Sequence, residues 1–322
     1  MNTFVKNTAL IVLGNRFLLR RRLNAISKNA RLTILNLHRV SEEDGSAYRP
    51  LSPKHFIELL VFLKRHFELI TFADLETEHR SDKPKLILSF DDGYRDFIDV
   101  AVPILQKHQI RVNQNIIPEC VEADLPPLNV LAQDFIGKAP ALLLRELRIP
   151  GMITKHLVDK RIQMGLTVSS FLKNKPFSEQ QELSRQLTPQ FFRFDQFKPT
   201  PMMSRSEIAQ LFELHEFGAH SYSHASMGIE SDEYFRKDLG ACRDYFRSAF
   251  NSSVHIYAFP NGSHRSSQIQ TARACGFRHV LLVGDLFSDC DAVVHHRFGF
   301  EARSRREVFF RAFGGLAKVR AK

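Results

Sequence analysis

Short apolar runs alternate with amphipathic stretches along most of this chain. Residues 32–37 and 85–90 are apolar runs bounded by polar residues, which is typical of buried strands. Between such runs, apolar residues recur at helical spacing, as they do after Ser52 and Pro53, a pair typical of a helix start. This alternation predicts a mostly parallel sheet whose strands are connected by helices.

The same patterns give the expected elements. Strands are expected at residues 32–37, 69–72, 85–90, 111–117, 217–220, 254–259, 278–283 and 293–300. Helices are expected at residues 53–67, 94–108, 204–214, 231–250 and 268–275. The second of these contains Pro103, which lacks an N–H and predicts a kink or break. Residues 118–203 show long helical patterns and a Phe-rich piece, so we expect a helical insertion with its own local core.

Candidate chemistry follows four of the expected strands. These positions are His38, the pair Asp91-Asp92, the pair His220 and His224, and the turn 260–262. In a β/α barrel, the loops after the carboxyl ends of the strands share one face and form the active site. Residues far apart in the sequence can therefore converge.

One carboxylate and two imidazoles form a ligand set for a divalent metal ion with positions left open for water and substrate. The second carboxylate is then free to act as a base, a combination that points to hydrolysis. Each motif has a simpler interpretation. Asp91-Asp92-Gly93 alone is often only a turn, and His220 with His224 could lie on one face of a helix.

The motifs together resemble the polysaccharide deacetylase family, also called the NodB-homology domain or carbohydrate esterase family 4. Its first motif is matched by Ser89-Phe90-Asp91-Asp92-Gly93, its second by His220-Ser-Tyr-Ser-His224, and its third by Tyr257-Ala-Phe-Pro260-Asn-Gly262. The resemblance covers roughly residues 32–120 and 200–300. It implies a distorted or incomplete (β/α) barrel of the NodB-homology type.

The resemblance also implies roles for individual residues. Asp91 would be the general base, and Asp92, His220 and His224 would be the metal ligands. Zinc is the expected ion, with cobalt, nickel or manganese as alternatives. Asn261 would offer its backbone N–H to the tetrahedral oxyanion.

A general acid must protonate the departing amine. One family branch places this acid in a strand–His motif before the carboxylates, and Leu35-Asn36-Leu37-His38-Arg39-Val40 resembles that motif. We therefore expect His38 to be the acid. His295 and His296 are the alternatives, because other branches place the acid late in the chain, and a satisfied buried histidine is the simpler interpretation of His38.

Two departures from the family pattern bear on the substrate. The third motif usually opens with an Arg that orients the base, and here the position holds Tyr257. The chain also contains no Trp, so a sugar platform must come from other side chains, which argues against a long or crystalline polymer. The expected substrate-binding residues are Tyr94, Tyr222, Tyr257, Phe259 and Pro260.

Composition suggests an anionic partner. The net charge is +10, and residues 1–31 carry seven basic and no acidic residues, interleaved with apolar ones. We expect a basic amphipathic segment that contacts an anionic membrane surface, although a helix packed on the domain would show the same pattern. Its apolar run is too short to span a bilayer. No recognised nucleic-acid motif is present.

The sequence therefore predicts two regions, a basic segment at 1–31 and a catalytic domain at 32–322 with its insertion at 118–203. The expected function is metal-dependent removal of an N-acetyl group from an amino sugar in a glycan, glycan precursor or glycolipid. The alternatives are a deformylase of a lipid-linked formamido sugar and a catalytically silent glycan- or membrane-binding module. The expected location is cytoplasmic, with attachment at the inner membrane face as a variant; four cysteines without a CxxC pair fit a reducing compartment.

Overall fold

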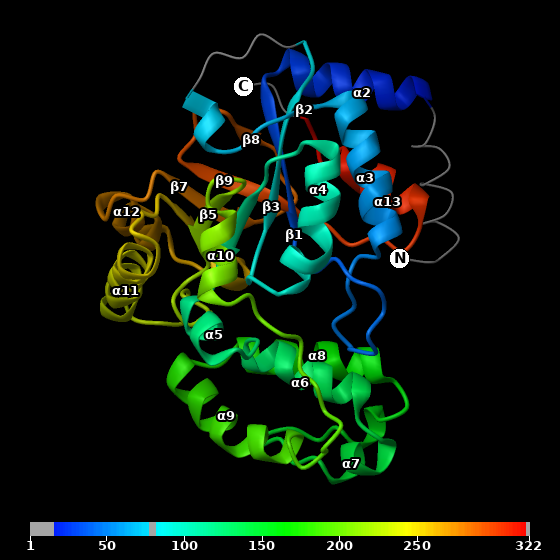
Figure 1. The fold of residues 1–322 in the computed structure, drawn as a ribbon, viewed down its shortest axis with the longest axis vertical. Helices are drawn as coiled ribbons and strands as arrows, with labels where there is room; N and C mark the ends of the chain where they lie inside the picture. The colour runs from blue at the N-terminus through cyan, green and yellow to red at the C-terminus, as the bar shows by residue number, and fades with distance from the viewer. Residues whose placement is uncertain (1–15, 77–81, 320–322) are drawn as a thin grey trace.

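The computed structural model describes residues 16–76 and 82–319, and parallel strands form its centre (Figure 1). The strands are β1 (Arg31–Leu37), β2 (Glu68–Leu69), β3 (Lys85–Phe90), β4 (Asn113–Ile116), β5 (Glu216–Ala219), β6 (Ile256–Ala258), β7 (His279–Val283), β8 (Ser288–Asp289) and β9 (Val294–Gly299). Seven of these nine, all except β2 and β8, close into a parallel barrel because β1 pairs with both β9 and β3. The predicted (β/α) barrel is confirmed. It differs from the standard eight-stranded (β/α) barrel because it has seven strands.

Helices surround the barrel, and their starts follow local sequence signals. They are α2 (Arg16–Lys28), α3 (Pro53–His66), α4 (Val102–His108), α10 (Arg205–Leu211), α11 (Asp232–Phe250), α12 (Ser266–Ala274) and α13 (Arg305–Ala312). The Ser52 side chain caps α3, and Ser204 and Glu207 form the predicted capping box of α10. A π-helical turn, η2 (Phe97–Ala101), precedes α4, so the predicted irregularity at Pro103 is confirmed.

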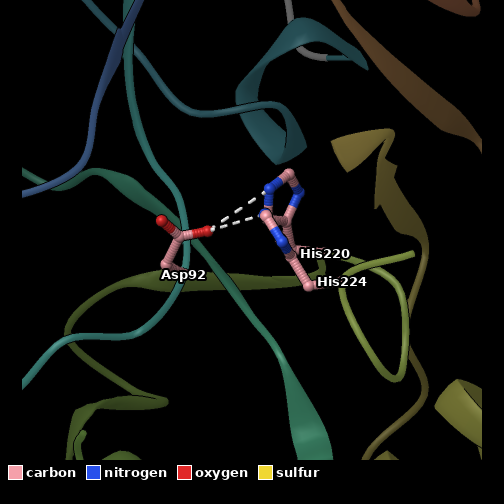
Figure 2. Close-up of side chains that lie close together, drawn as sticks. All are labelled: Asp92, His220 and His224. Atoms are coloured by element: carbon pink, nitrogen blue, oxygen red, sulfur yellow. Dashed lines mark ion pairs between the residues drawn. The ribbon is translucent and has the colours of Figure 1, made fainter. Parts of the chain in front are cut away.

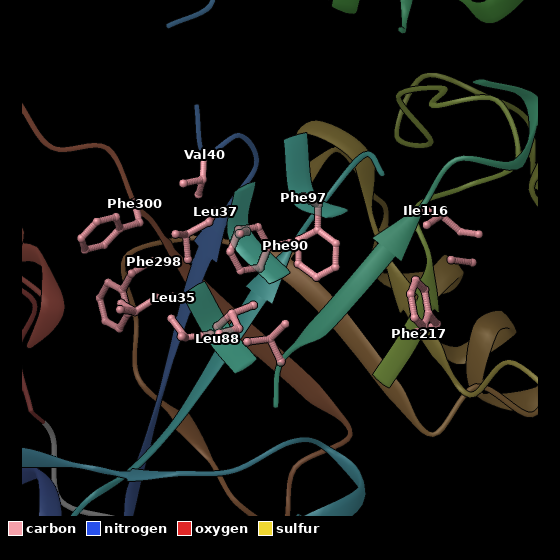
Figure 3. Packing of buried hydrophobic residues seen from close by; sticks show 14 of the residues in the cluster. Leu35, Leu37, Val40, Leu88, Phe90, Phe97, Ile116, Phe217, Phe298 and Phe300 are labelled. Carbon is pink, nitrogen blue, oxygen red and sulfur yellow. The ribbon is translucent and has the colours of Figure 1, made fainter. Parts of the chain in front are cut away.

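Strand alternation divides the apolar side chains between the inside and the outside of the barrel. On β3, Leu86, Leu88 and Phe90 pack outward against helices in the main core (Figure 3). Ile87 points inward with a smaller apolar cluster, and Ser89 continues that inward row with a polar group. The inside of the barrel is therefore apolar at the start of the strands and polar near their carboxyl ends.

The insertion forms a helical layer at one end of the barrel (Figure 1, green). Its helices are α5 (Pro118–Ala123), α6 (Leu128–Lys138), α7 (Ala141–Glu146), η3 (Lys155–Leu157), α8 (Arg161–Lys173) and α9 (Phe177–Phe191). It has a core of its own, in which the Phe135 and Phe191 rings stack with centroids 4.7 Å apart and Phe197 packs edge-on to Phe135. The Phe-rich piece is thus local core, except for exposed Phe192.

The helix α2 packs on the barrel. Leu23 and Ile26 are buried, and the Arg22 guanidinium donates hydrogen bonds to the carbonyls of Phe313 and Ala317. The alternative of a packed helix therefore holds for this part of the basic segment, whereas residues 1–15 lie outside the described residues. Between residues 16 and 319, apart from 77–81, no helix is long and apolar enough to cross a bilayer.

Candidate active site

The carboxyl ends of two strands bring the predicted metal ligands together. Asp92 follows β3, and His220 and His224 follow β5 (Figure 2). The Asp92 Oδ1 atom lies 3.4 Å from His220 Nε2 and 3.6 Å from His224 Nε2. All three side chains are buried, and one ligand atom from each lies within 4.8 Å of the other two.

Positive φ angles after β3 and in the histidine loop set the directions of these side chains. Asp92 has φ 78° and Gly93 has φ 85°, so the chain turns sharply after β3. A Cβ atom at Gly93 would lie 3.1 Å from Ile116 Cγ2, which makes glycine the residue that fits. Ser221 and His224 also have positive φ, of 60° and 63°. The two histidines therefore lie on a loop, and the alternative of a helical face is excluded.

Asp238 on α11 fixes this histidine loop from behind. Its Oδ1 accepts hydrogen bonds from the Ser221 hydroxyl (3.0 Å) and the Tyr222 backbone N–H (2.9 Å). Its Oδ2 accepts one from the Tyr257 hydroxyl at 2.9 Å. Burial raises the pKa of Asp238 to about 6, although these donors favour its charged form. Tyr257 thus supports the loop that carries His220 and His224, and its hydroxyl bonds to Asp238, not to Asp91.

The residues fit a divalent metal ion. The ring Nδ1 of His220 lies 2.9 Å from the Ala258 carbonyl, and a proton on that nitrogen leaves Nε2 free to bind metal. Burial lowers the pKa of His224 to about 3, which keeps its imidazole in the neutral form that metals require. Within the described part of the chain, the buried Asp92 Oδ1 has no hydrogen-bond partner. A cation would satisfy that oxygen.

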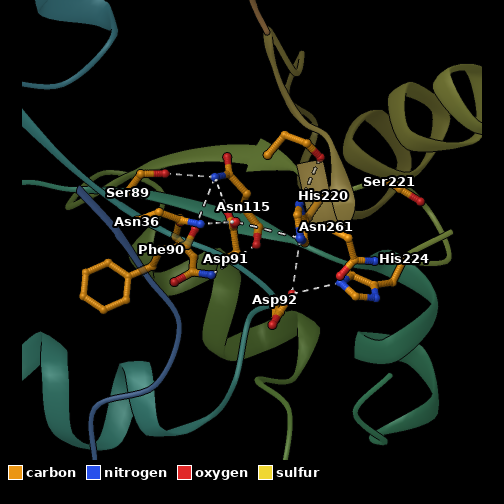
Figure 4. Close-up of polar contacts among 12 residues, drawn as sticks. Asn36, Ser89, Phe90, Asp91, Asp92, Asn115, His220, Ser221, His224 and Asn261 are labelled. Atoms are coloured by element: carbon orange, nitrogen blue, oxygen red, sulfur yellow. Dashed lines mark hydrogen bonds and ion pairs between the residues drawn. The ribbon is translucent and has the colours of Figure 1, made fainter. Parts of the chain in front are cut away.

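Asp91 is held by a buried arginine that the sequence reading did not identify. Arg297 on β9 donates from Nη1 to Asp91 Oδ1 at 2.7 Å and from Nη2 to Oδ2 at 2.8 Å. Asn115 and Asn36 donate one hydrogen bond each to the same carboxylate (Figure 4). Burial alone would raise the pKa of Asp91, but Arg297 and His220 outweigh it and hold that pKa well below its usual range.

The sequence feature that could have identified Arg297 is the alternation of inward and outward side chains along the strands. Asn36, Ser89, Asn115 and Arg297 all point into the barrel, and Arg297 also donates to the Asn36 and Ser89 side chains, at 3.0 Å each. Polar residues at inward positions of otherwise apolar strands indicate a buried network. Arg297 therefore orients the Asp91 carboxylate, and Tyr257 does not contact it.

His38 lies at the site, and the two late histidines do not. It follows β1, is half-buried, and is close enough to Asp92 and Asp91 for both carboxylates to oppose the lowering of its pKa by burial. His295 and His296 stand at the start of β9, and the His295 ring contacts His279 at 3.2 Å. The amino end of a parallel barrel strand faces away from the catalytic end.

The third motif forms a turn beside the histidine loop. Asn261 has φ 58° within η4 (Pro260–Gly262), and its side-chain amide donates to the Ser226 hydroxyl at 3.1 Å. Figure 4 shows Asn261 next to His224. The expected oxyanion residue thus lies beside one of the expected metal ligands.

Most of the expected sugar-binding residues are buried, which corrects that expectation. Tyr94, Tyr257 and Phe259 have no exposed surface, and Pro260 is buried as well. Tyr257 and Phe259 pack with Phe235 in the main core because strand alternation turns Tyr257 outward from the barrel. Tyr222 alone of the five is half-exposed.

The comparisons with known proteins agree with this geometry. The family model for polysaccharide deacetylase matches residues 187–280, which include His220, His224 and the turn 260–262. No curated protein matches the sequence. The chain is thus similar to the polysaccharide deacetylase family over these residues.

Solved structures of deacetylases share the fold. The Streptococcus pyogenes deacetylase PplD, in complex with acetate, superposes with a TM-score of 0.58 at 14% identity, covering 88% of this chain and 98% of that one. IcaB from Ammonifex degensii gives 0.56 at 15% identity, with 88% and 97% covered. A de-N-acetylase from Aggregatibacter actinomycetemcomitans gives 0.54 at 13% identity, with 83% and 94% covered.

Proposed function

We propose that this protein is a metal-dependent hydrolase that removes an N-acetyl group from an amino sugar. One observation carries the proposal: a buried Asp-His-His triad stands beside a second carboxylate that a bidentate arginine keeps ionised. A binding module has no need for that second, oriented carboxylate. The arrangement suits activation of a water molecule against an amide.

Each residue has a step in the proposed mechanism. A divalent ion bound by Asp92, His220 and His224 would polarise the acyl carbonyl and increase the acidity of the attacking water. Asp91 accepts the proton of that water as the new C–O bond forms. The backbone N–H of Asn261 donates to the developing oxyanion. The amide C–N bond then breaks.

His38 completes the reaction by giving a proton to the leaving amine nitrogen. Acetate and a free amino sugar are the products. Burial lowers the pKa of His38, which makes its protonated form a stronger acid, and the two carboxylates limit that shift.

The proposed substrate is a glycan precursor, glycolipid or short oligosaccharide. The absence of Trp and the burial of Tyr94, Tyr257 and Phe259 leave few aromatic surfaces for a long polymer. We also propose that residues 32–322 act as one catalytic domain, with 118–203 as an insertion that carries its own core. Acetate release from N-acetylated oligosaccharides by the zinc- or cobalt-loaded protein tests the proposal, and no release from any amino sugar would contradict it.

Substitution of His38 tests its assignment as the general acid. We expect His38→Ala to lower kcat by about 10²-fold, as loss of a general acid does, with metal still bound. The measurement is acetate release, with metal content as the check on the site. His296→Ala is the matched control and should stay near the wild-type rate. A normal rate in His38→Ala, with loss in His296→Ala, would move the acid role to the late histidine.

An anionic membrane surface remains a proposed partner, at the inner membrane face. Leu23 and Ile26 of α2 are buried against the barrel, so attachment would use the exposed residues Arg20, Arg21 and Lys28. We expect sedimentation with phosphatidylglycerol vesicles that weakens with salt and with replacement of all three by Gln, since each basic residue contributes about 1 kcal/mol. Equal binding to neutral phosphatidylcholine vesicles, or none at low salt, would contradict this attachment.

A further inference from the structure

A cavity lies between the helical insertion and the histidine loop, beside one of the candidate metal ligands. Its volume is about 200 Å³, and Ser223 and His224 line it from the barrel side. Residues of α9 and of the segment 119–131 supply the other walls, so most of the cavity is built by the insertion. A ligand held in this cavity would therefore lie next to the candidate metal site.

Hydrogen bonds fix the walls of this cavity to the barrel. The backbone N–H of Glu119, in α5, donates to the carbonyl of Tyr222 in the histidine loop at 2.9 Å. At the start of α9, the backbone N–H of Phe177 donates to the Glu230 carboxylate at 2.7 Å. Both contacts join the insertion to the segment that follows β5. The cavity is therefore preformed, and its walls keep their position relative to His224.

The wall formed by α9 is polar but uncharged. Gln181, Ser184 and Thr188 line the cavity, and their spacing of three and four residues places them on one strip of the helix. The hydroxyl oxygens of Ser184 and Thr188 lie 3.3 Å apart. The charged side chains of Glu182 and Arg185 pair with each other on the exposed part of the helix. Amide and hydroxyl groups can both donate and accept hydrogen bonds, as the hydroxyl groups of a sugar do.

The wall formed by the segment 119–131 is mostly apolar. Pro126, Pro127, Leu128 and Leu131 line it. Glu119 is the one acidic side chain among the described residues that line the cavity, and none of them is Lys or Arg. A carboxylate accepts hydrogen bonds from hydroxyl groups but repels a phosphate. Apolar walls with a few polar groups are typical of small-molecule sites, and these particular groups suit an uncharged sugar ring.

We propose that this cavity binds one uncharged sugar residue that is linked to the N-acetylated sugar. The inference rests on the proposed function and specifies its substrate as a short oligosaccharide, in preference to an amino sugar linked directly to phosphate. The volume of about 200 Å³ is smaller than the range of about 300–1,000 Å³ typical of pockets for drug-sized ligands. The cavity therefore has room for a single ring.

Calorimetric binding in the presence of zinc tests this site. The probes are N-acetylglucosamine and its β-1,4-linked and β-1,6-linked dimers and trimers. We expect the wild type to bind one of the dimers at least about 10-fold more tightly than the monosaccharide, which corresponds to one or two additional neutral hydrogen bonds. The trimer of the same linkage should bind little more tightly than the dimer, because the cavity holds one ring.

Variants of α9 assign the dimer preference to the cavity. Gln181→Ala should reduce this preference by about 2–10-fold, the range for one neutral hydrogen bond. Ser184→Leu, which removes a hydroxyl and fills the cavity, should abolish it. The matched control is Gln186→Ala, which changes an exposed glutamine of the same helix outside the cavity and should keep the preference.

Two results would overturn the inference. One is the absence of any dimer preference in the wild type, which decides the question whether or not the variants fold. The other is a dimer preference that Ser184→Leu retains in full, since the second sugar would then bind elsewhere. Acetate release from the same sugars, measured in parallel, decides the proposed function separately. A dimer preference without acetate release would support the sugar site and contradict the hydrolase.

Discussion

Replacement of Asp91 by Asn is expected to abolish turnover while the metal stays bound. The amide keeps the shape of the carboxylate but cannot accept the proton of the attacking water. Loss of a general base costs up to about 10⁴-fold in rate. Asp91 is not part of the Asp92, His220 and His224 triad, so the ligand set remains. The measurements are acetate release and metal content of the same preparation.

The neighbouring carboxylate supplies the control for that experiment. Asp92→Asn should lose metal and activity together, because Asp92 Oδ1 lies 3.4 Å and 3.6 Å from the two histidine nitrogens. If Asp91→Asn instead loses the metal and Asp92→Asn keeps it, the roles of the two carboxylates are exchanged.

Replacement of Arg297 by Met is expected to have the largest effect on stability. It would leave Asp91 buried without its counter-ion, and breaking a buried ion pair in this way typically costs about 3–5 kcal/mol in the free energy of unfolding. Arg297 has no exposed surface and also bonds to Asn36 and Ser89. Urea unfolding measures the change, and activity should be lost with it.

Three comparisons distinguish a specific pair from general loss of packing. The double variant Asp91→Asn with Arg297→Met should be less destabilised than the sum of the single changes, because neither partner is left charged alone. Arg297→Lys keeps the charge but not the bidentate geometry, and should be intermediate. Arg185→Ala removes an exposed arginine paired with Glu182 and should change stability little. Additive effects in the double variant would contradict the pairing.

The pair also has a pH signature. The folded protein holds the pKa of Asp91 below that of an unfolded chain, so it binds this proton more weakly. The pair therefore stabilises the fold fully at neutral pH, and its contribution declines as the pH falls below the ordinary pKa of aspartate. In Arg297→Met, the free energy of unfolding should therefore fall less as the pH is lowered than it does in the wild type.

The elements set by local patterns were predictable from the sequence. The strand at 85–90 and the caps at Ser52 and Ser204 depend on neighbouring residues, and all three are observed. The convergence of Asp92 with His220 follows from parallel topology, since both come directly after strands. The short strand β8 and the helix α13 lacked a clear periodic signal and were not predicted.

The orientation of side chains across strands was harder to predict. Arg297 reaches Asp91 from a strand more than two hundred residues later, so only the closed barrel brings them together. Tyr257 was expected near the substrate, but the inward or outward direction of a strand residue depends on register with its neighbours. The contacts of Asp238 with Ser221 and Tyr222, which fix the histidine loop, likewise come from a separate helix and are revealed by no local pattern.

Metal content of the purified protein tests the central claim most directly. After reconstitution with zinc and removal of excess metal, the account predicts about one ion per chain in the wild type and a large loss in His220→Ala. His156→Ala, an exposed histidine of the insertion, is the matched control and should retain the metal. A folded wild-type protein without stoichiometric metal would contradict the hydrolase mechanism and favour a silent binding module.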